Sequence, residues 1–441
     1  MVSLGCPKNL VDTEVMLGHL AREGFVLEDP DTSRVVIVNT CGFIDRAKEE
    51  SVEAILREVA RKEAGEIDRV IVAGCMVQKY GRELSGEIPE VDAFIGLDEL
   101  ENAPAAALGL PSLPRFTEKP LATRLYDDLA PRVLTRRRGY AYLKVAEGCN
   151  NPCTFCTIPQ MRGLQRSRTV ESLVAEAQGL RSQGVSELCL ISQDTTRYGE
   201  DIGLTRTGLS TLVARLLAET DFPWIRFLYA YPKTLHRSVL ELMAKEPRFL
   251  PYVDIPLQHV ARPVLTAMKR GGDSTSYRKM IGEMREVVPG IAIRTTFIVG
   301  FPNETAADFD EMLSFVTDME LDNVGVFTYS EEPNSGAAPL GDPVPAALKE
   351  ERRARILEAQ QPIAKAKNQA KKGKTFEALL EGPSEETEHL LEARLTSQAP
   401  EIDGRVLINE VPEGFLPGPS AMVRVKITKA HEYDLVGRIV A

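Results

Sequence analysis

The sequence predicts an α/β protein in three parts: an N-terminal doubly wound α/β domain, a central six-stranded partial (β/α) barrel and a small C-terminal antiparallel β-barrel. Over most of the chain, short apolar runs alternate with helical patterns, which is typical of parallel sheets with crossover helices. After Lys374 the pattern changes to short strands alone, which is typical of small barrels. The predicted domains are residues 1–110, 140–345 and 373–441, joined by a linker at 111–139 and a helical segment at 346–372.

The first domain carries three isolated cysteines, each directly after a short strand. Buried parallel strands are predicted at residues 35–39, 69–73 and 91–95. Cys6, Cys41 and Cys75 each follow the carboxyl end of a strand, where sheets of this kind bind ligands. We therefore expect these three thiols to converge at one edge of the sheet. The alternative is three unrelated buried thiols, because free cysteine is often a core residue.

Residues 111–139 are predicted as a linker, because proline interrupts any longer helix or strand there. The prolines in and just before it are Pro104, Pro111, Pro114, Pro120 and Pro131. The segment ends on three arginines, Arg136–Arg138. A solvated loop and a contact to an anion are both compatible with that run of charge.

The central domain contains six further apolar runs separated by helical patterns. They lie at residues 141–145, 187–192, 226–230, 253–255, 292–299 and 323–327. Six such units predict a parallel barrel two units short of the eight-stranded kind. One helix is expected over 171–182, with Thr169 as its N-cap and Gly184 after its end. Functional residues of parallel barrels lie past the strand carboxyl ends; here these are residues 147–156, 193–195, Tyr229, Tyr231, Gln258, His259 and 300–302.

The loop after the first barrel strand contains a C-x3-C-x2-C motif, formed by Cys149, Cys153 and Cys156. Three thiolates can hold three irons of a 4Fe–4S cluster and leave the fourth iron open to another ligand, so these are the candidate catalytic residues. A structural zinc site needs four protein ligands, and no histidine lies near the motif. Zinc and three inert thiols are therefore the weaker interpretations. Cys189 lies alone inside a predicted strand and is interpreted as a core residue.

The last part of the chain begins with a charged segment, residues 346–372, which is expected to form a solvated helix because both signs alternate along it. Short strands follow at residues 375–380, 390–394, 406–408, 421–426 and 437–440. They suggest a small barrel of the oligonucleotide-binding type. Residues 375–441 hold twelve acidic and six basic residues, and the acids include Glu385, Glu386 and Glu388.

The whole chain of 441 residues has a net charge of −11. A generic nucleic-acid coating protein would be basic, so this balance favours a basic protein partner. No apolar run reaches the ~18 residues that cross a membrane, and the first residues lack the basic and apolar regions of a signal peptide. We therefore expect a cytoplasmic protein without a membrane partner, in which cysteines bind metal or serve catalysis more often than they form disulfides.

The cysteine motifs resemble those of a known family. Residues 149–156, C-N-N-P-C-T-F-C, are similar to the signature of radical S-adenosylmethionine (SAM) enzymes, and the upstream cysteines are similar to the methylthiotransferase branch. Residues 3–9, 191–196, 254–260 and 294–302 resemble the RimO type, which modifies a ribosomal protein, more than the MiaB type, which modifies tRNA. The resemblance covers the whole chain. It implies a barrel of the radical SAM type and a C-terminal TRAM domain.

The resemblance also implies cofactors and a reaction. One 4Fe–4S cluster would lie on Cys149, Cys153 and Cys156, and an auxiliary 4Fe–4S cluster on Cys6, Cys41 and Cys75. One SAM would methylate a sulfur on the auxiliary cluster, and a second SAM would give a 5′-deoxyadenosyl radical that abstracts hydrogen from the substrate. The implied product carries a methylthio group on the β-carbon of an aspartate in small-subunit ribosomal protein number twelve.

Contacts to SAM are predicted from position alone, at Gln193, Asp194, His259 and Arg294, with a packing role as the alternative for each. The implied partners are the ribosomal protein, a low-potential electron donor of the flavodoxin or ferredoxin type, and a sulfur donor. The acidic C-terminal barrel suits a basic protein and disfavours tRNA, since RNA binding draws on Lys and Arg. Two alternatives remain: a tRNA adenosine methylthiotransferase, and a non-catalytic iron–sulfur or RNA-binding protein.

Overall fold

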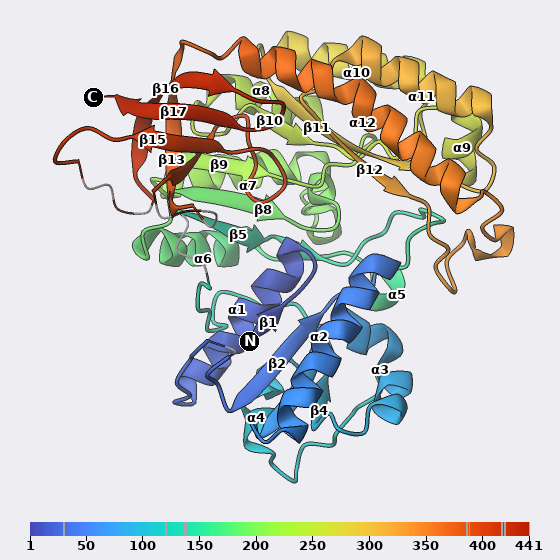
Figure 1. The fold of residues 1–441 in the computed structure, drawn as a ribbon, viewed down its shortest axis with the longest axis vertical. Coiled ribbons are helices and arrows are strands. Elements are labelled where there is room, and N and C mark those ends of the chain that lie inside the picture. The colour runs from blue at the N-terminus through green and yellow to red at the C-terminus, as the bar shows by residue number, and fades with distance from the viewer. Residues whose placement is uncertain are drawn as a thin grey trace.

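The structure, a computed structural model, describes residues 1–29, 31–119, 121–135, 139–384, 387, 389–415, 418 and 420–440. The arginines Arg136–Arg138 and the acids Glu385, Glu386 and Glu388 lie outside these residues. The N-terminal domain lies below a barrel of parallel strands, and a small closed barrel packs at the side (Figure 1). In the described part of the chain, no helix is both long and apolar enough to span a membrane.

The N-terminal domain contains one parallel sheet with helices on both faces, as predicted. In sheet order the strands are β1 (Val2–Ser3), β2 (Val35–Thr40), β3 (Arg69–Gly74) and β4 (Ala93–Ile95). One face is covered by α1 (Pro7–Arg22) and α4 (Ala103–Leu108), the other by α2 (Asp45–Glu63) and α3 (Cys75–Glu87). The covering helix changes face between β1 and β2. The carboxyl ends of the strands lie along one edge of the sheet, where folds of this kind bind ligands.

The central domain contains six parallel strands in two sheets that adjoin at β9 and β10. They are β5 (Tyr140–Lys144), β8 (Glu187–Ile191), β9 (Trp224–Phe227), β10 (Tyr252–Asp254), β11 (Ala292–Val299) and β12 (Asn323–Thr328). The outer helices are α6 (Val170–Ser182), α7 (Gly208–Glu219), α8 (Arg237–Lys245), α9 (Arg262–Ala267), α10 (Ser274–Val287) and α11 (Ala306–Met319). The prediction of a six-stranded partial barrel is confirmed. The Thr169 side chain caps α6 by accepting a hydrogen bond from the Ser172 N–H.

Two short strands and one short helix surround the cysteine loop of the barrel: β6 (Ala146–Glu147), β7 (Arg166–Ser167) and α5 (Ile158–Arg162). Single 3₁₀ turns lie at Leu100–Asn102, Thr195–Arg197, Glu200–Ile202, Thr205–Thr207 and Ala338–Leu340. Cys189 on β8 is fully buried, which confirms its interpretation as a core residue.

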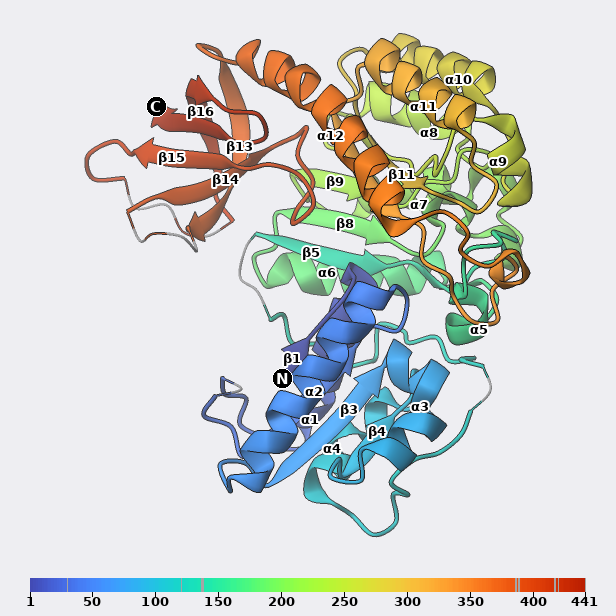
Figure 2. The same cartoon turned by 45° about the vertical axis from the view of Figure 1, so that its right-hand side comes forward.

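The charged helix α12 (Ala346–Gln369) lies along β12 and α11 (Figure 2). The expectation of a solvated helix is wrong for its inner face. Lys349 and Arg352 are buried there, and Arg352 pairs with Glu304 at 2.6 Å. The reason is that α12 covers the last strand of the open barrel, so its inner charges meet partners from the barrel.

The C-terminal strands close into a barrel in the order β13–β14–β15–β17–β16. They are β13 (Thr375–Pro383), β14 (Leu391–Leu395), β15 (Val406–Glu410), β16 (Met422–Ala430) and β17 (Leu435–Val440). The segment after β14 enters the amino-terminal end of the central barrel. There the Tyr140 hydroxyl donates to Glu401 at 2.9 Å, and the Tyr252 hydroxyl donates to Asp403 at 2.7 Å.

A buried ion-pair network joins the two barrels. Glu187 of β8 is fully buried between Arg226 at 2.7 Å and Arg394 of β14 at 2.6 Å. Burial acts to raise the pKa of Glu187, but the two guanidinium groups lower it below its usual value. The carboxylate therefore stays charged, and it depends on a side chain from the C-terminal barrel.

We expect Arg394→Ala to lower the free energy of unfolding of the docked C-terminal barrel by about 3–5 kcal/mol, because it leaves a buried charge underpaired. Urea unfolding combined with limited proteolysis after α12 measures this. The matched control is Arg438→Ala in the same barrel, whose ion pair with Glu410 is exposed and should contribute about 0–1 kcal/mol. Equal losses in the two variants would contradict the assignment.

Candidate active site between two groups of cysteines

The first group of cysteines lies on the loop between β6 and α5, past the end of the first barrel strand. Backbone hydrogen bonds hold this loop: the Cys149 N–H donates to the Gly163 carbonyl at 3.1 Å, and the Thr154 N–H donates to the Met268 carbonyl at 3.1 Å. Gly148 has a φ of +80°, and a Cβ there would lie 2.1 Å from the Leu164 carbonyl oxygen. The turn before the first cysteine therefore requires glycine.

Each sulfur of this group receives a hydrogen bond at 3.4 Å. The donors are the Asn151 N–H to Cys149, the Ile158 N–H to Cys156 and the Arg270 guanidinium to Cys153. Burial raises the pKa of Cys149 to about 11 and that of Cys156 to about 12. A coordinating metal deprotonates such thiols, and the N–H groups are suited to the thiolates that result. The donor set fits a 4Fe–4S cluster with one open iron.

The second group lies past the carboxyl ends of β1, β2 and β3 in the N-terminal sheet. Cys6 is the N-cap of α1, Cys41 follows β2 and Cys75 begins α3. Gly5, with a φ of +88°, brings the backbone against Cys41, because a Cβ on it would lie 2.8 Å from the Cys41 Cβ. Burial raises the pKa of Cys75 to about 12, and the neighbouring Cys6 and Cys41 add to that shift. The three thiols thus lie close enough to affect one another, as cluster ligands must.

Arg162, the last residue of α5, connects the two groups. Its guanidinium donates to the Cys75 sulfur at 3.1 and 3.3 Å. It also pairs with Asp12 of α1 at 2.9 Å and with Glu147 of β6 at 2.9 Å. A side chain that follows the barrel motif therefore reaches the cysteines of the other domain.

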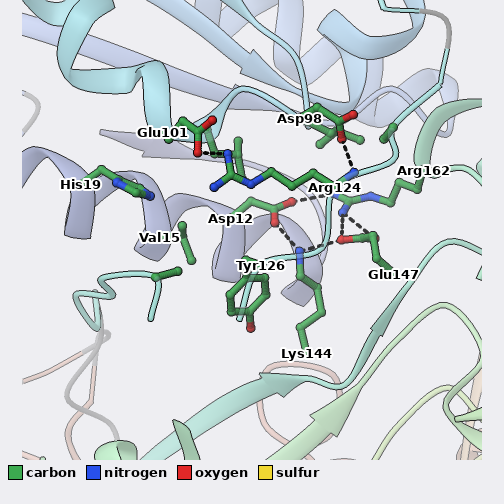
Figure 3. A pocket seen from close by; sticks show the side chains of 14 residues that line it. Asp12, Val15, His19, Asp98, Glu101, Arg124, Tyr126, Lys144, Glu147 and Arg162 are labelled. Atoms are coloured by element: carbon green, nitrogen blue, oxygen red, sulfur yellow. Dashed lines mark hydrogen bonds and ion pairs between the residues drawn. The ribbon is translucent and has the colours of Figure 1, made fainter. Parts of the chain in front are cut away.

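Lys144 completes a buried four-charge network with Asp12, Glu147 and Arg162, which Figure 3 shows beside a small cavity. Lys144 pairs with both carboxylates, at 2.6 Å for Glu147. All four side chains are less than a tenth exposed. Burial acts to raise the pKa of Glu147, but Arg162 and Lys144 hold it well below its usual value. Two cations and two carboxylates neutralise one another between the domains.

Gln193 and Asp194 lie beside the barrel cysteines. The Gln193 amide donates to Glu147 at 2.6 Å, and its carbonyl oxygen is buried without a hydrogen-bond partner among the described residues. Asp194 accepts from the Asn151 amide at 2.7 Å, and burial raises its pKa. These two side chains are therefore next to the loop that holds Cys149.

His259 and Arg294 contact other residues. His259 is fully buried, accepts from the Ala261 N–H at 3.0 Å, and lies 3.4 Å from Glu304. Arg294 lies between Asp254 at 3.5 Å and Asp403 at 3.4 Å. Both contact other protein groups, although the His259 Nε2 and Arg294 Nε atoms are buried without a hydrogen-bond partner among the described residues.

Two residues past the strand ends have strained backbones. Tyr229 has a φ of +65° and Gln258 a φ of +71°, a region that residues other than glycine rarely adopt. The Tyr229 N–H donates to Asp254 at 3.1 Å, and the Gln258 N–H donates to the Thr296 carbonyl at 2.8 Å. Such strain concentrates at functional sites, in agreement with the position of both residues at the barrel mouth.

Sequence reasoning missed Lys8, Asp12, Lys144 and Arg162 as parts of this site. One signal was available, because Lys144 is the only charged residue in the strand predicted at 141–145. Buried charges need partners, but nothing in the spacing identified them. Among the described residues, no three His, Cys, Asp or Glu side chains are arranged to hold a single metal ion.

Comparisons with known proteins agree with this architecture. Three family models match in order: the uncharacterized protein family UPF0004 over residues 1–96, the radical SAM superfamily over 143–316 and the TRAM domain over 373–440. A protein of Solibacter usitatus named ribosomal protein uS12 methylthiotransferase RimO is 49% identical, over 100% of this chain and 94% of its own. A protein of Koribacter versatilis with the same name is 44% identical, over 99% and 95%. The chain belongs to the RimO family of methylthiotransferases.

Solved structures show the same fold outside the RimO family. TsrM of Kitasatospora setae, a radical SAM methyltransferase, has a TM-score of 0.55 and 18% identity over 77% of this chain and 74% of that one. OxsB, a cobalamin-dependent SAM radical enzyme, has a TM-score of 0.51 and 12% identity over 79% and 54%. At these identities the likeness supports the fold alone. Family membership and the radical SAM match make this chain a radical SAM enzyme with SAM and 4Fe–4S as cofactors.

We expect the anaerobically reconstituted protein to hold about eight irons, about four on each group of cysteines. Replacing Cys149, Cys153 and Cys156 with Ala should remove about four irons and leave the other cluster in place. Iron and sulfide analysis with Mössbauer spectroscopy measures both quantities. Cys189→Ala is the matched control, because this thiol is buried outside both groups and its loss should cost no iron. Bound zinc, or only four irons in the wild type, would contradict the assignment of two clusters.

Proposed function

We propose that this chain inserts a methylthio group at the β-carbon of an aspartate in ribosomal protein uS12, using two SAM molecules and two 4Fe–4S clusters. The observation that supports this most is the pairing of two groups of three thiols across one buried network, with Arg162 touching Cys75 and following the barrel motif. The relatives named for uS12 methylthiolation match along the whole chain, which supports the same substrate.

In this proposal the side chains hold and position the reactants. When bound, the clusters and SAM supply the sulfur, the methyl group and the radical that removes hydrogen from an unactivated carbon. Cys149, Cys153 and Cys156 would hold one cluster at the barrel mouth, and Cys6, Cys41 and Cys75 would hold the other past the strand ends of the N-terminal sheet. The Arg162 network keeps the two domains at a fixed separation, which a transfer between their sites requires.

SAM contacts, donors and domain limits are also part of the proposal. We assign Gln193 and Asp194 as SAM contacts. Asp194 accepts a hydrogen bond from Asn151 in the loop that holds Cys149, and the Gln193 carbonyl oxygen is buried without a partner among the described residues. The partners of His259 and Arg294 favour positioning roles for these two. A flavodoxin-like or ferredoxin-like protein would supply electrons, and a separate donor would supply sulfur. The domain limits are those stated above, 1–110, 140–345 and 373–441.

A tRNA substrate is the second candidate, and one surface favours it. Much of the acidic surplus of the C-terminal barrel is internal: Glu381 and Glu392 pair with arginines, and Glu401 and Asp403 accept from tyrosines. The outer face of β16 instead exposes Arg424, Lys426 and Lys429. A basic strip of this kind can contact phosphates, on tRNA or on ribosomal RNA around uS12.

Mass spectrometry of uS12 and of bulk tRNA from a strain lacking this protein separates these candidates. The proposal expects uS12 to lose the mass of one methylthio group while tRNA methylthiolation stays unchanged. Complementation with the wild-type chain should restore the uS12 modification. Loss of a methylthio nucleoside with unmodified uS12 in both strains would establish the tRNA candidate, and no change in either would favour a non-catalytic protein.

A triple variant separates the two half-reactions. We expect Cys6→Ala, Cys41→Ala, Cys75→Ala to release 5′-deoxyadenosine from SAM under reduction, because the barrel group is complete and lies at the strand carboxyl ends. The same variant should form no methylthiolated uS12. Liquid chromatography of the nucleoside and mass spectrometry of uS12 measure both. Methylthiolated product from this variant would mean that the N-terminal cysteines do not have the proposed role.

A further inference from the structure

Lys8 lies where the N-terminal domain meets the mouth of the central barrel. It is two residues after Cys6, in the first turn of α1, and α1 packs against the first barrel strand, β5. Its ammonium nitrogen lies 3.1 Å from the ring centroid of Tyr229, the strained residue past the end of β9. Lys8 therefore extends from the N-terminal domain into the mouth of the barrel.

The Lys8 side chain is buried, and among the described residues no carboxylate forms an ion pair with its ammonium. The side chain is 6% exposed. In the part of the chain that the structure describes, its ammonium has no ion pair and lies over the Tyr229 ring. A lysine is rarely buried unless it is paired, and a cation–π contact replaces little of the lost hydration.

Asp254 and Glu147 are the carboxylates whose charges act most strongly on Lys8. Both have other partners. Asp254 accepts from the Tyr229 N–H and faces Arg294 at 3.5 Å. Glu147 lies between Lys144 and Arg162. The Arg162 network is already balanced, with two cations and two carboxylates. Among the described residues, Lys8 thus has no carboxylate of its own at the barrel mouth, and the Cys6 thiol is the group whose charge most favours the protonated lysine.

We infer that Lys8 is the specificity residue for an acidic substrate side chain, binding the aspartate carboxylate of uS12 through its ammonium. This inference rests on the proposed function. The reacting carbon must be reached both from the barrel cysteines and from the cysteine group that includes Cys6, so it must lie between them. The β-carbon of aspartate is bonded directly to its carboxylate. A cation at this place therefore meets the carboxylate whenever the carbon is in position for reaction.

Charge pairing here selects aspartate against its neutral analogue. An asparagine has the same size but leaves the Lys8 ammonium unpaired in a desolvated site, so it should bind more weakly. The competing explanation is that Lys8 compensates the charge of the cluster on Cys6, Cys41 and Cys75. In that case its loss would change that cluster and would affect aspartate and asparagine substrates equally.

The test uses the reconstituted full-length protein and two forms of uS12, one with the target aspartate and one with asparagine in its place. The variants are Lys8→Met, which keeps the stem and removes the charge, and Lys8→Arg, which keeps the charge. Binding affinity by isothermal titration is measured for each pair, with SAM present and without reductant. Removing an unpaired buried charge should not destabilise the fold, and Lys8→Arg reports on the site if Lys8→Met unfolds.

We expect the wild type to bind the aspartate form about 10- to 100-fold more tightly than the asparagine form, as for a buried charge-assisted pair. Lys8→Met should abolish this preference, and Lys8→Arg should keep most of it. Iron content and the EPR spectrum of the auxiliary cluster should match the wild type in Lys8→Met. Lys279→Met, an exposed lysine of α10, is the matched control for the loss of one charge and should keep the full preference.

A preference for aspartate that survives in Lys8→Met would overturn the inference. So would a changed EPR spectrum with equal losses for both uS12 forms, which would assign Lys8 to the cluster. Failure of the proposed function gives a different result, because the wild type would then methylthiolate neither form of uS12 under reducing conditions.

Discussion

The position of helix α1 between two domains is the constraint on which the active-site geometry depends. One side of α1 packs into the N-terminal sheet through Met16 and Leu20, and the other packs into the central barrel through Val11 and Val15. Its polar residues face the junction, where Asp12 joins Lys144 and Arg162. A helix buried on two sides cannot shift without opening both cores. Cys6 at its start is thereby fixed relative to the barrel loop.

The buried charges at this junction fix the position of one domain relative to the other more than they stabilise the fold. Replacing buried ion pairs with apolar residues is often neutral or stabilising, whereas breaking one is costly. The Arg162 guanidinium has fixed directions for its donors, and here they are used on Asp12, Glu147 and Cys75 together. A small rotation of one domain would break several of these contacts at once. The proposed reaction brings two sites to one carbon, which needs such precision.

Local patterns predicted most of the fold, because the strands are short apolar runs and the cysteines follow strand ends. The runs at 292–299 and 323–327 correspond almost residue for residue to β11 and β12. The pairing of Asp12 with Arg162 could not be predicted in this way, since it joins residues far apart in sequence and depends on how two domains dock. The prediction for the inner face of α12 was wrong for the same reason. Lys349 and Arg352 are charged residues, but each forms an ion pair within a buried surface.

The C-terminal barrel covers the amino-terminal end of the central barrel. Its segment around Ala399 and Ile402 packs among Tyr140, Tyr142 and Tyr252 inside the lumen, and Glu401 and Asp403 take the tyrosine hydroxyls as donors. The lumen of the central barrel is thus closed at its amino-terminal end. In the proposed reaction, the tyrosine rings and their hydrogen-bonded hydroxyls would keep bulk water away from the reacting groups on that side. The C-terminal barrel, whose fold is typical of oligonucleotide-binding domains, thus also forms part of the wall of the central barrel.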